Sequence, residues 1–311
     1  RSLRVYSQLF GVPNSAYKAE LIRSVDSYQI DCILAYWGTN PIADILTIKK
    51  ARPKVKVLLN VLCHPTGLSA SKVAAQNWLL RRSLRYCDGL ILSSRAMQSY
   101  FSKEILRQRP VKTLVLPPYL SEHYRPRDRL PPCRDEPNLL FLGRTDWSAG
   151  QQTDNVRSIL QEILDHGFHL YHSRTKESVQ PHACRHVFAS KPLSELGSFV
   201  TQFDASLVVY NLDGCARDDR FRVTIPDRLL ASVAFGIPIA IPKKGYQACK
   251  EFLCDYGAVI EYGSVAELFD RLSDRADVRR LRSVAEANSN NYVGERHSSR
   301  LREFIALVLA G

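Results

Sequence analysis

The sequence predicts an α/β protein built from two doubly wound, Rossmann-like domains. Short apolar runs alternate with helical patterns over most of the 311 residues, which is typical of parallel sheets with crossover helices. A chain of this length commonly holds two domains, and a proline-rich, charged stretch interrupts the pattern near its middle. We therefore expect two open parallel sheets, each with ligand-binding residues directly after its strands.

The strands are predicted from apolar runs that are bounded by turn residues and separated by helical patterns. Such runs are too short for helices and are rich in the branched side chains that strands prefer. In chain order they cover residues 30–37, 55–62, 88–94, 111–118, 138–144, 168–173, 186–190, 205–211, 237–242 and 257–262.

Composition sets the predicted domain boundaries. The stretch PPYLSEHYRPRDRLPPCRDEP at 117–137 has no periodic apolar face that could be buried. The chain also reaches its first clear strand after a single helical stretch, so we expect the N-terminal domain to be incomplete. The predicted parts are an N-terminal domain over 1–119, a linker over 120–137, a C-terminal domain over 138–283 and C-terminal helices over 284–311.

The run FRVTIPDRLLASVAFGIPIAIP at 221–242 predicts an anion site at the start of a helix. Pro226 suits a first helical turn, and Gly236 suits the end of the helix before a buried strand. Arg228 then lies in the first turn, where unpaired N–H groups and the helix dipole already favour an anion such as phosphate. The alternative is that Arg228 forms a surface ion pair.

A second cationic residue follows the strand at 138–144. Gly143 allows a sharp turn at the strand end, so Arg144 is expected to point into the crevice beyond the sheet. Two arginines in one crevice suit a diphosphate, because each guanidinium can bond phosphate oxygens in a fork. The alternative for Arg144 is an ion pair with a neighbouring carboxylate.

Four motifs in order resemble the GT-B glycosyltransferases, particularly family 4, the group 1 glycosyl transferases. FLGR at 141–144 resembles the first strand and phosphate loop of their C-terminal domain. RYCDGLILSSRAMQSYF at 85–101 and LPPYL at 116–120 are similar to the end of their N-terminal domain and the linker after it. The donor-binding pattern P-x-[KR]-L-x-x-x-x-A-x-G-x-P is matched by Pro226, Arg228, Leu229, Ala234, Gly236 and Pro238.

The resemblance implies roles for particular residues. Arg144 and Arg228 would contact the donor phosphates, Lys191 would lie beside the nucleotide base, and His64 would face the transferred sugar. The alternative for His64 is an ordinary histidine that bonds the backbone at a strand end. The predicted catalytic residues are His64, Arg144 and Arg228, and the predicted donor-binding residues are Gly143, Arg144, Lys191, Arg222, Ile225, Pro226, Asp227 and Arg228.

The activity that the resemblance implies is transfer of a sugar from a nucleotide-diphosphate sugar to a hydroxyl of a glycan or lipid-linked acceptor. Retention of anomeric configuration is favoured, although inverting relatives share the pattern. One departure is clear, because the family's ribose-binding glutamate is replaced by Ala231. The alternatives are therefore a nucleotide-sugar-modifying relative of the epimerase kind and a degenerate, non-catalytic partner subunit. The last helix would pack back on the N-terminal domain.

Neither a metal nor a cofactor is predicted. RDDR at 217–220 is not an Asp-x-Asp pair, and a diphosphate held by arginines and a helix terminus needs no divalent ion. His166, His169 and His172 cross a predicted helix-to-strand junction, where three side chains would not converge on one metal. The eight cysteines form no CxxC pair, which favours a reducing compartment and a cytoplasmic location.

Charge suggests a surface for a partner. Residues 1–119 contain 18 Lys and Arg against six Asp and Glu, whereas the remainder contains 25 of each, so the net charge of +12 belongs to the N-terminal domain. Arg81, Arg82 and Arg85 interleave with Trp78 and leucines in the helical pattern at 71–86, which would suit the anionic inner face of a membrane. The alternative is a solvated basic face over a buried apolar stripe. Because no nucleic-acid-binding motif accompanies the charge, we expect no nucleic acid partner.

Overall fold

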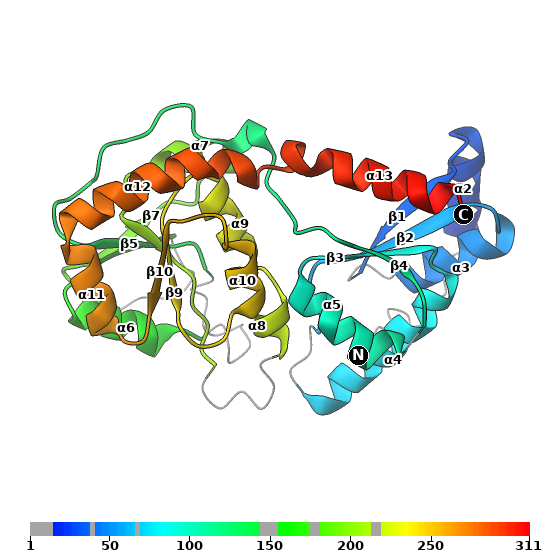
Figure 1. The fold of residues 1–311 in the computed structure, drawn as a ribbon, viewed down its shortest axis with the longest axis horizontal. Helices are drawn as coiled ribbons and strands as arrows, with labels where there is room; N and C mark the ends of the chain where they lie inside the picture. Colours follow the sequence, from blue (N-terminus) through cyan, green and yellow to red (C-terminus); the bar gives the residue numbers. More distant parts are fainter. Residues whose placement is uncertain are drawn as a thin grey trace. The chain divides into compact units, whose positions relative to one another are not determined.

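The structure is a computed structural model that describes residues 15–37, 41–65, 69–107, 109–143, 155–173, 181–212 and 219–311. It divides into two compact units (Figure 1). Unit 1 is made of Arg1–Pro117, Asp219–Ile225 and Ser298–Gly311, and unit 2 is made of Pro118–Asp218 and Pro226–His297. Within the described residues, every helix is too short or too polar to cross a bilayer.

Unit 1 is built on a four-stranded parallel sheet in the order β1-β2-β3-β4. The simple strand order follows from three successive strand–helix–strand crossovers in one direction. The strands are β1 (Cys32–Tyr36), β2 (Lys56–Val61), β3 (Gly89–Leu92) and β4 (Lys112–Val115), and the helices are α2 (Ser15–Ser27), α3 (Pro41–Ala51), α4 (Ala70–Ser83), α5 (Arg95–Phe101), α8 (Asp219–Val223) and α13 (Ser298–Leu309).

The two faces of this sheet are covered by different parts of the chain. Ile33 packs with the helices α2 and α3, whereas its neighbours in β1, Cys32 and Leu34, pack on the cluster that α13 completes. Alternate residues of a strand point to opposite faces, so α13 lies on the face opposite α2 and α3. A β-carbon on Gly89 would crowd Phe304 of α13, which explains a glycine in a buried strand.

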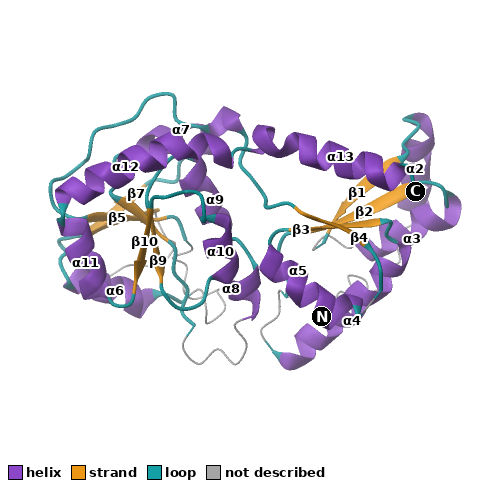
Figure 2. Ribbon diagram, viewed as in Figure 1, coloured by secondary structure: helices purple, strands orange, loops and turns teal. Residues whose placement is uncertain are grey.

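Unit 2 is built on a six-stranded parallel sheet in the order β10-β9-β8-β5-β6-β7, flanked by helices (Figure 2). The order runs outward from β5 through β6 to β7 and then returns to the other side of β5. The strands are β5 (Asn138–Phe141), β6 (His169–Ser173), β7 (Arg185–Phe188), β8 (Ala205–Leu207), β9 (Ile239–Pro242) and β10 (Val259–Tyr262), and the helices are α6 (Arg157–Asp165), α7 (Leu193–Val200), α9 (Asp227–Ala234), α10 (Gln247–Phe252), α11 (Val265–Ser273) and α12 (Arg275–Ser289).

A buried polar network joins the two strands at which the order reverses. The backbone N–H of Asn138, at the start of β5, donates to Asp204 Oδ2 at 3.0 Å, and the N–H of Asp204 donates to Asn138 Oδ1 at 2.9 Å. Arg275 of α12 then bonds both carboxylate oxygens of Asp204, at 2.7 and 3.0 Å. Asp204 is fully buried, so its charge depends on these partners. The network sets the register of β5 against β8.

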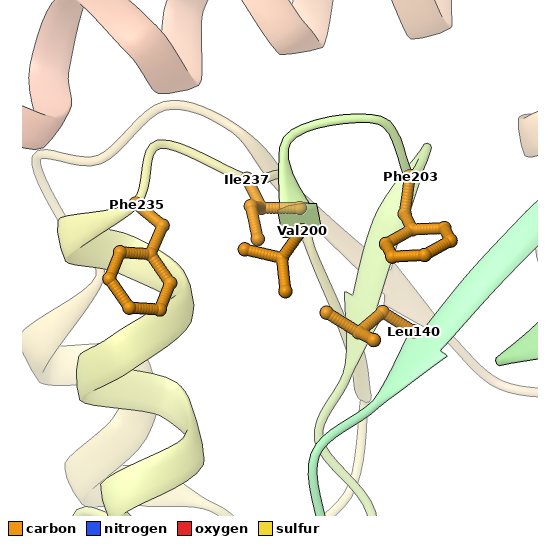
Figure 3. Close-up of a cluster of buried hydrophobic side chains, with 5 residues drawn as sticks. All are labelled: Leu140, Val200, Phe203, Phe235 and Ile237. Atoms are coloured by element: carbon orange, nitrogen blue, oxygen red, sulfur yellow. The ribbon is translucent and has the colours of Figure 1, made fainter. Parts of the chain in front are cut away.

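One apolar cluster holds α7 and α9 against β5 (Figure 3). Leu140 points from the sheet toward Val200 and Phe203, and Phe235 and Ile237 complete the cluster at the end of α9. Gly236 lies between the last two with a φ of 70°, a left-handed conformation that ends α9 as the sequence predicted. The cluster therefore fixes where α9 begins and ends relative to the sheet.

The predicted fold class is confirmed, because all ten predicted strands are present and all their pairings are parallel. The domain boundaries differ from those predicted. Residues 219–225 belong to unit 1 rather than to the C-terminal domain, and α12 stays in unit 2, so of residues 284–311 only 298–311 belong to unit 1. Those residues form α13 and the short end that follows it.

The proline-rich stretch at 120–137 also differs from a linker, because it packs along unit 2. Leu120 and Tyr124 contact the Leu140 cluster, and the N–H of Leu130 donates to Thr201 Oγ1 at 2.9 Å. Arg129 donates to the carbonyls of Phe235 and Gly236. These are contacts of individual side chains, which leave no periodic signal in the sequence.

We predict that Asp204→Ala destabilises the protein by about 3–5 kcal/mol, because it leaves Arg275 partly buried without its carboxylate. Urea unfolding followed by circular dichroism measures the loss. Asp270→Ala, which removes an exposed carboxylate from α11, is the matched control and should change stability little. Equal unfolding midpoints for the two variants would contradict the importance of the network.

Candidate functional site

The reversal of strand order between β5 and β8 marks the place where a ligand site is expected. In open α/β sheets, ligands bind outside the carboxyl ends of the two strands at which the order reverses. Here those ends are Phe141–Gly143, which include the last residue of β5, and Val208–Asn211 after β8. The residues that gather at these two ends are therefore the first candidates.

Arg228 lies at this place. Pro226 is the N-cap of α9, so Arg228 is the second helical residue. Its Nη2 donates to the carbonyl oxygen of Val209 at 3.1 Å. The guanidinium carbon lies 4.0 Å from the ring centroid of Tyr210 and 5.3 Å from that of Phe141. A cation that follows β8 in sequence is thus held between the ends of β5 and β8.

The charge of Arg228 is incompletely satisfied. The side chain is partly buried, and its Nε is buried without a hydrogen-bond partner among the described residues. Among the described residues, no carboxylate forms an ion pair with the Arg228 guanidinium. Its recorded contacts are one carbonyl and two aromatic faces, which favour a cation but do not neutralise it. An anion would complete the site.

Two neighbouring residues keep Arg228 in place. A β-carbon on Gly143 would overlap both Arg228 Nη1 and the Phe141 ring, so any other residue here would force these two side chains to shift. The hydroxyl of Ser232, one turn along α9, donates to the Arg228 carbonyl at 2.8 Å and lies 2.7 Å from Ser206 Oγ of β8. These contacts tie the first turn of α9 to the sheet.

Tyr246 supports the loop after β8. It is buried, and its hydroxyl oxygen accepts a hydrogen bond from the backbone N–H of Tyr210 at 2.7 Å. Burial raises the pKa of the Tyr246 hydroxyl well above its ordinary value, so the phenol stays neutral. The sequence analysis missed Phe141, Tyr210 and Tyr246. Tyr210 could have been found as an aromatic residue that directly follows a predicted strand.

The other predicted donor-binding residues are distributed as follows. Asp227 is exposed beside Arg228 in the first turn of α9. Lys191 follows β7, two strands from β5, and its Nζ lies 5.0 Å from the ring centroid of Phe199. Arg144 lies outside the described residues. Arg222, which is exposed, and Ile225, which is buried, belong to unit 1.

His64 belongs to unit 1 and follows β2 by three residues. It is fully buried, and its Nε2 lies 2.7 Å from Oδ1 of Asn77 in α4. The ring centroids of Trp37, Tyr100 and Phe101 lie 6.1, 5.8 and 5.4 Å from that of His64. The alternative of a backbone-bonded histidine does not apply within the described residues, where the hydrogen bond of His64 goes to a side chain.

The electrostatic environment keeps His64 neutral. Burial lowers its pKa to about 4, although the hydrogen bond with Asn77 opposes that change. Its Nδ1 is buried and has no hydrogen-bond partner among the residues that the structure describes. At neutral pH the imidazole therefore holds one proton and presents one unsatisfied nitrogen.

Among the residues that the structure describes, no group of three or more His, Cys, Asp or Glu side chains is placed to hold a metal ion. His169 and His172 lie on β6, and His166 ends α6. His169 instead pairs with His186 of β7, with 2.9 Å between Nδ1 and Nε2. Burial is the main cause that lowers the pKa of both imidazoles.

The backbone resembles those of several solved structures. Sucrose-phosphate synthase from Thermosynechococcus elongatus superposes with a TM-score of 0.67 at 11% identity, over 94% of this chain and 77% of that one. The trehalose 6-phosphate synthase of Burkholderia multivorans gives 0.63 at 10% identity, over 94% and 76%. A glycosyltransferase from Rickettsia africae gives 0.61 at 13% identity, over 96% and 83%.

The chain has the GT-B fold. At these identities the likeness concerns the fold and carries no substrate. No protein-family profile matches the sequence, and no curated protein matches it. Membership of family 4 therefore stays a prediction. In this GT-B chain, unit 2 carries the strand reversal with Arg228, and unit 1 carries His64.

We predict that His64 makes the stability of the protein depend on pH. Its pKa is 6.5 when unfolded and about 4 when folded, so the unfolded chain binds the proton first. The contribution of the neutral His64 to the free energy of unfolding should be fully present above pH 6.5. The free energy of unfolding should then fall by about 3 kcal/mol as the pH approaches 4. Urea unfolding at a series of pH values measures this loss.

His64→Gln should lack this component of the pH dependence, whatever its stability at neutral pH. His123→Gln, which replaces an exposed imidazole, is the matched control and should retain the wild-type profile. The interpretation would be wrong if His64→Gln and the wild type lost stability in parallel between pH 6.5 and 4.

Proposed function

We propose that the protein is a glycosyltransferase that transfers a sugar from a nucleotide-diphosphate sugar to a hydroxyl of a glycan or lipid-linked acceptor. The observation that carries this proposal is Arg228, a partly buried cation between the ends of β5 and β8 whose one hydrogen bond in the described structure goes to a carbonyl. The GT-B fold and the sequence resemblance support it.

The proposed role of Arg228 is to stabilise the leaving group. When the bond from the sugar to the diphosphate breaks, negative charge grows on the phosphate oxygens. A guanidinium that Tyr210, Phe141 and the Val209 carbonyl already hold in place would meet that charge without reorganising. The first turn of α9 would add its N–H groups and its dipole.

The remaining assignments of this proposal come from the resemblance. Arg144 would add a second guanidinium, Lys191 would lie near the base, and His64 would contact a sugar hydroxyl. Retention of anomeric configuration is the proposed outcome. No metal or cofactor is invoked, because two arginines and a helix terminus can hold a diphosphate.

We predict that Arg228→Ala slows sugar transfer by about 100-fold or more, because it removes a preorganised charge from the transition state. Isothermal titration with UDP, GDP, ADP and dTDP first identifies the nucleotide. A product assay with the corresponding nucleotide sugars then measures the rate, and proton NMR of the product gives the anomeric configuration.

Two control variants sharpen this experiment. Arg228→Lys keeps the charge but loses the planar fork, so it should retain part of the nucleotide affinity. Arg271→Ala, which removes an exposed guanidinium from α11 of the same unit, should behave as the wild type. Full activity of a folded Arg228→Ala protein would refute the site. Nucleotide binding by the wild type without any transfer would favour a non-catalytic role.

We also propose that α4 and the short helical turn after it, Leu84–Tyr86, dock unit 1 on an anionic membrane surface that holds the acceptor. Trp78 and Tyr86 are exposed, and the Arg82 guanidinium lies 5.4 Å from the Trp78 ring centroid. Arg85 is exposed as well, whereas Arg81 donates to the Glu104 carbonyl and so has a structural role. An exposed aromatic ring among cations suits a lipid headgroup region.

We predict that Arg82→Glu/Arg85→Glu abolishes co-sedimentation with phosphatidylserine vesicles and leaves nucleotide affinity unchanged. Wild-type binding should weaken as salt rises, because exposed charges are screened over about 8 Å at physiological ionic strength. Lys50→Glu/Lys54→Glu changes the same charge at other exposed positions of unit 1 and should still bind. Similar loss in both double variants would show that net charge matters and that α4 and the turn Leu84–Tyr86 have no special part.

A further inference from the structure

A cavity of about 240 Å³ lies at the amino ends of β2, β3 and β4 in unit 1. Its charged lining consists of Lys56, the first residue of β2, Asp88, which precedes β3, Arg109, and Lys112, the first residue of β4. Open α/β sheets bind their usual ligands at the opposite, carboxyl ends of the strands, where His64 follows β2. The cavity is therefore separate from the residues proposed to act in sugar transfer.

The only acidic side chain in the described lining is already paired. Asp88 Oδ2 lies 2.7 Å from Nζ of Lys49 and accepts a hydrogen bond from the backbone N–H of Val57 at 2.8 Å. The Lys49 and Asp88 side chains are only 15% and 25% exposed, so water screens this ion pair weakly. Because Lys49 balances the charge of Asp88, that carboxylate does not neutralise the cations of the cavity.

The three cations of the lining form no ion pair among the described residues. Arg109 Nη2 donates to the carbonyl oxygen of Arg85 at the long distance of 3.4 Å, and Lys112 Nζ donates to that of Leu307 at 2.8 Å. Within the same described part of the chain, the half-buried Lys56 has no side-chain partner. Carbonyl oxygens orient a cation without neutralising it. Like charges around one cavity repel each other, and a bound anion removes that repulsion.

The size and the charge of the cavity favour a small dianion. Pockets for drug-sized ligands begin at about 300 Å³, so 240 Å³ suits a phosphate group better than a whole nucleotide. A phosphomonoester carries a charge of about −2 at neutral pH, whereas a phosphodiester carries only one negative charge. The Arg109 guanidinium can bond two phosphate oxygens in a fork, and the Lys56 ammonium can contact a third as a point charge.

We propose that this cavity is a phosphomonoester site, in which Lys56 and Arg109 bind the phosphate and Lys112 adds positive charge. A lipid headgroup and a soluble phosphate ester share this chemistry, and the position of the cavity favours the lipid. Cys87, which lines the cavity, directly follows the turn Leu84–Tyr86, and the bond from Arg109 to the Arg85 carbonyl joins the cavity to that turn. In its lipid form, the inference rests on the proposed docking of α4 and this turn on a membrane.

Co-sedimentation with vesicles tests the lipid source. Phosphatidic acid ends in a phosphomonoester and phosphatidylglycerol contains a phosphodiester, so the two lipids are compared in vesicles adjusted to the same surface potential. The wild type should bind the phosphatidic acid vesicles about 5-fold or more tightly, the scale of one further basic contact at an anionic surface. Equal binding of the two lipids, together with no binding of a soluble phosphomonoester, would overturn the site.

Variants test the two phosphate ligands. Lys56→Gln/Arg109→Gln should weaken binding of phosphatidic acid by about 25-fold, which is about 5-fold for each basic contact, and should abolish the preference over phosphatidylglycerol. Lys50→Gln/Lys103→Gln removes the same charge from two exposed positions of unit 1 outside the cavity, and it should keep the preference. Lys56→Arg/Arg109→Lys retains both charges and should restore most of the affinity. An equal loss of preference in the cavity variant and the control would refute the site.

Isothermal titration with glycerol 3-phosphate, the soluble form of the same headgroup, separates the two sources. If the ligand is a lipid, glycerol 3-phosphate should bind more weakly than phosphatidic acid vesicles and should displace the protein from them. Affinity equal to that of the vesicles would assign the site to a soluble ester. In either case Lys56→Gln/Arg109→Gln should lose glycerol 3-phosphate binding, and an unchanged titration curve would overturn the site.

The same titration separates failure of this site from failure of the proposed docking. Arg82→Glu/Arg85→Glu should release the protein from both kinds of vesicle and yet keep its affinity for glycerol 3-phosphate, because the bond from Arg109 goes to the backbone of Arg85. Loss of vesicle binding with intact glycerol 3-phosphate binding in that variant supports the cavity. Wild-type protein that docks on phosphatidylglycerol and phosphatidic acid alike and binds no glycerol 3-phosphate would refute the cavity and retain the docking.

Discussion

The buried hydrogen-bonded pairing of Asn138 with Asp204 underlies the organisation of unit 2. It joins the amino ends of β5 and β8, the two neighbouring strands from which the sheet grows in opposite directions. Because Asp204 is buried, its carboxylate requires Arg275, and this requirement ties α12 to the same place. The carboxyl ends of β5 and β8 then lie side by side, which creates the position that Arg228 occupies.

The surroundings of Arg228 and of His64 have opposite electrostatic effects on the two side chains. Arg228 keeps its charge in a partly buried position, because aromatic faces and a carbonyl oxygen favour a cation without cancelling it. His64 is uncharged at neutral pH, because burial among aromatic rings disfavours the imidazolium and lowers the pKa of the side chain. The first environment favours an anionic ligand, and the second favours an uncharged imidazole.

Local signals were sufficient for much of the fold and part of the site. The ten strands could be predicted because each is a short apolar run between turn residues, and a buried strand needs little else. The start of α9 was predictable because Pro226 and Gly236 act within a few residues of the backbone they shape. The position of Arg228 followed directly from that boundary.

The sequence by itself determined the α/β class, the parallel sheets and the arginine in the first turn of α9, since these depend on neighbours along the chain. Only the tertiary structure decided that residues 219–225 belong to unit 1, and that the stretch at 120–137 packs on unit 2. It also decided that Asn77 and Tyr100 meet His64. Such contacts depend on how strands and helices that are distant in sequence are brought together, and single residues at their ends carry no periodic signal.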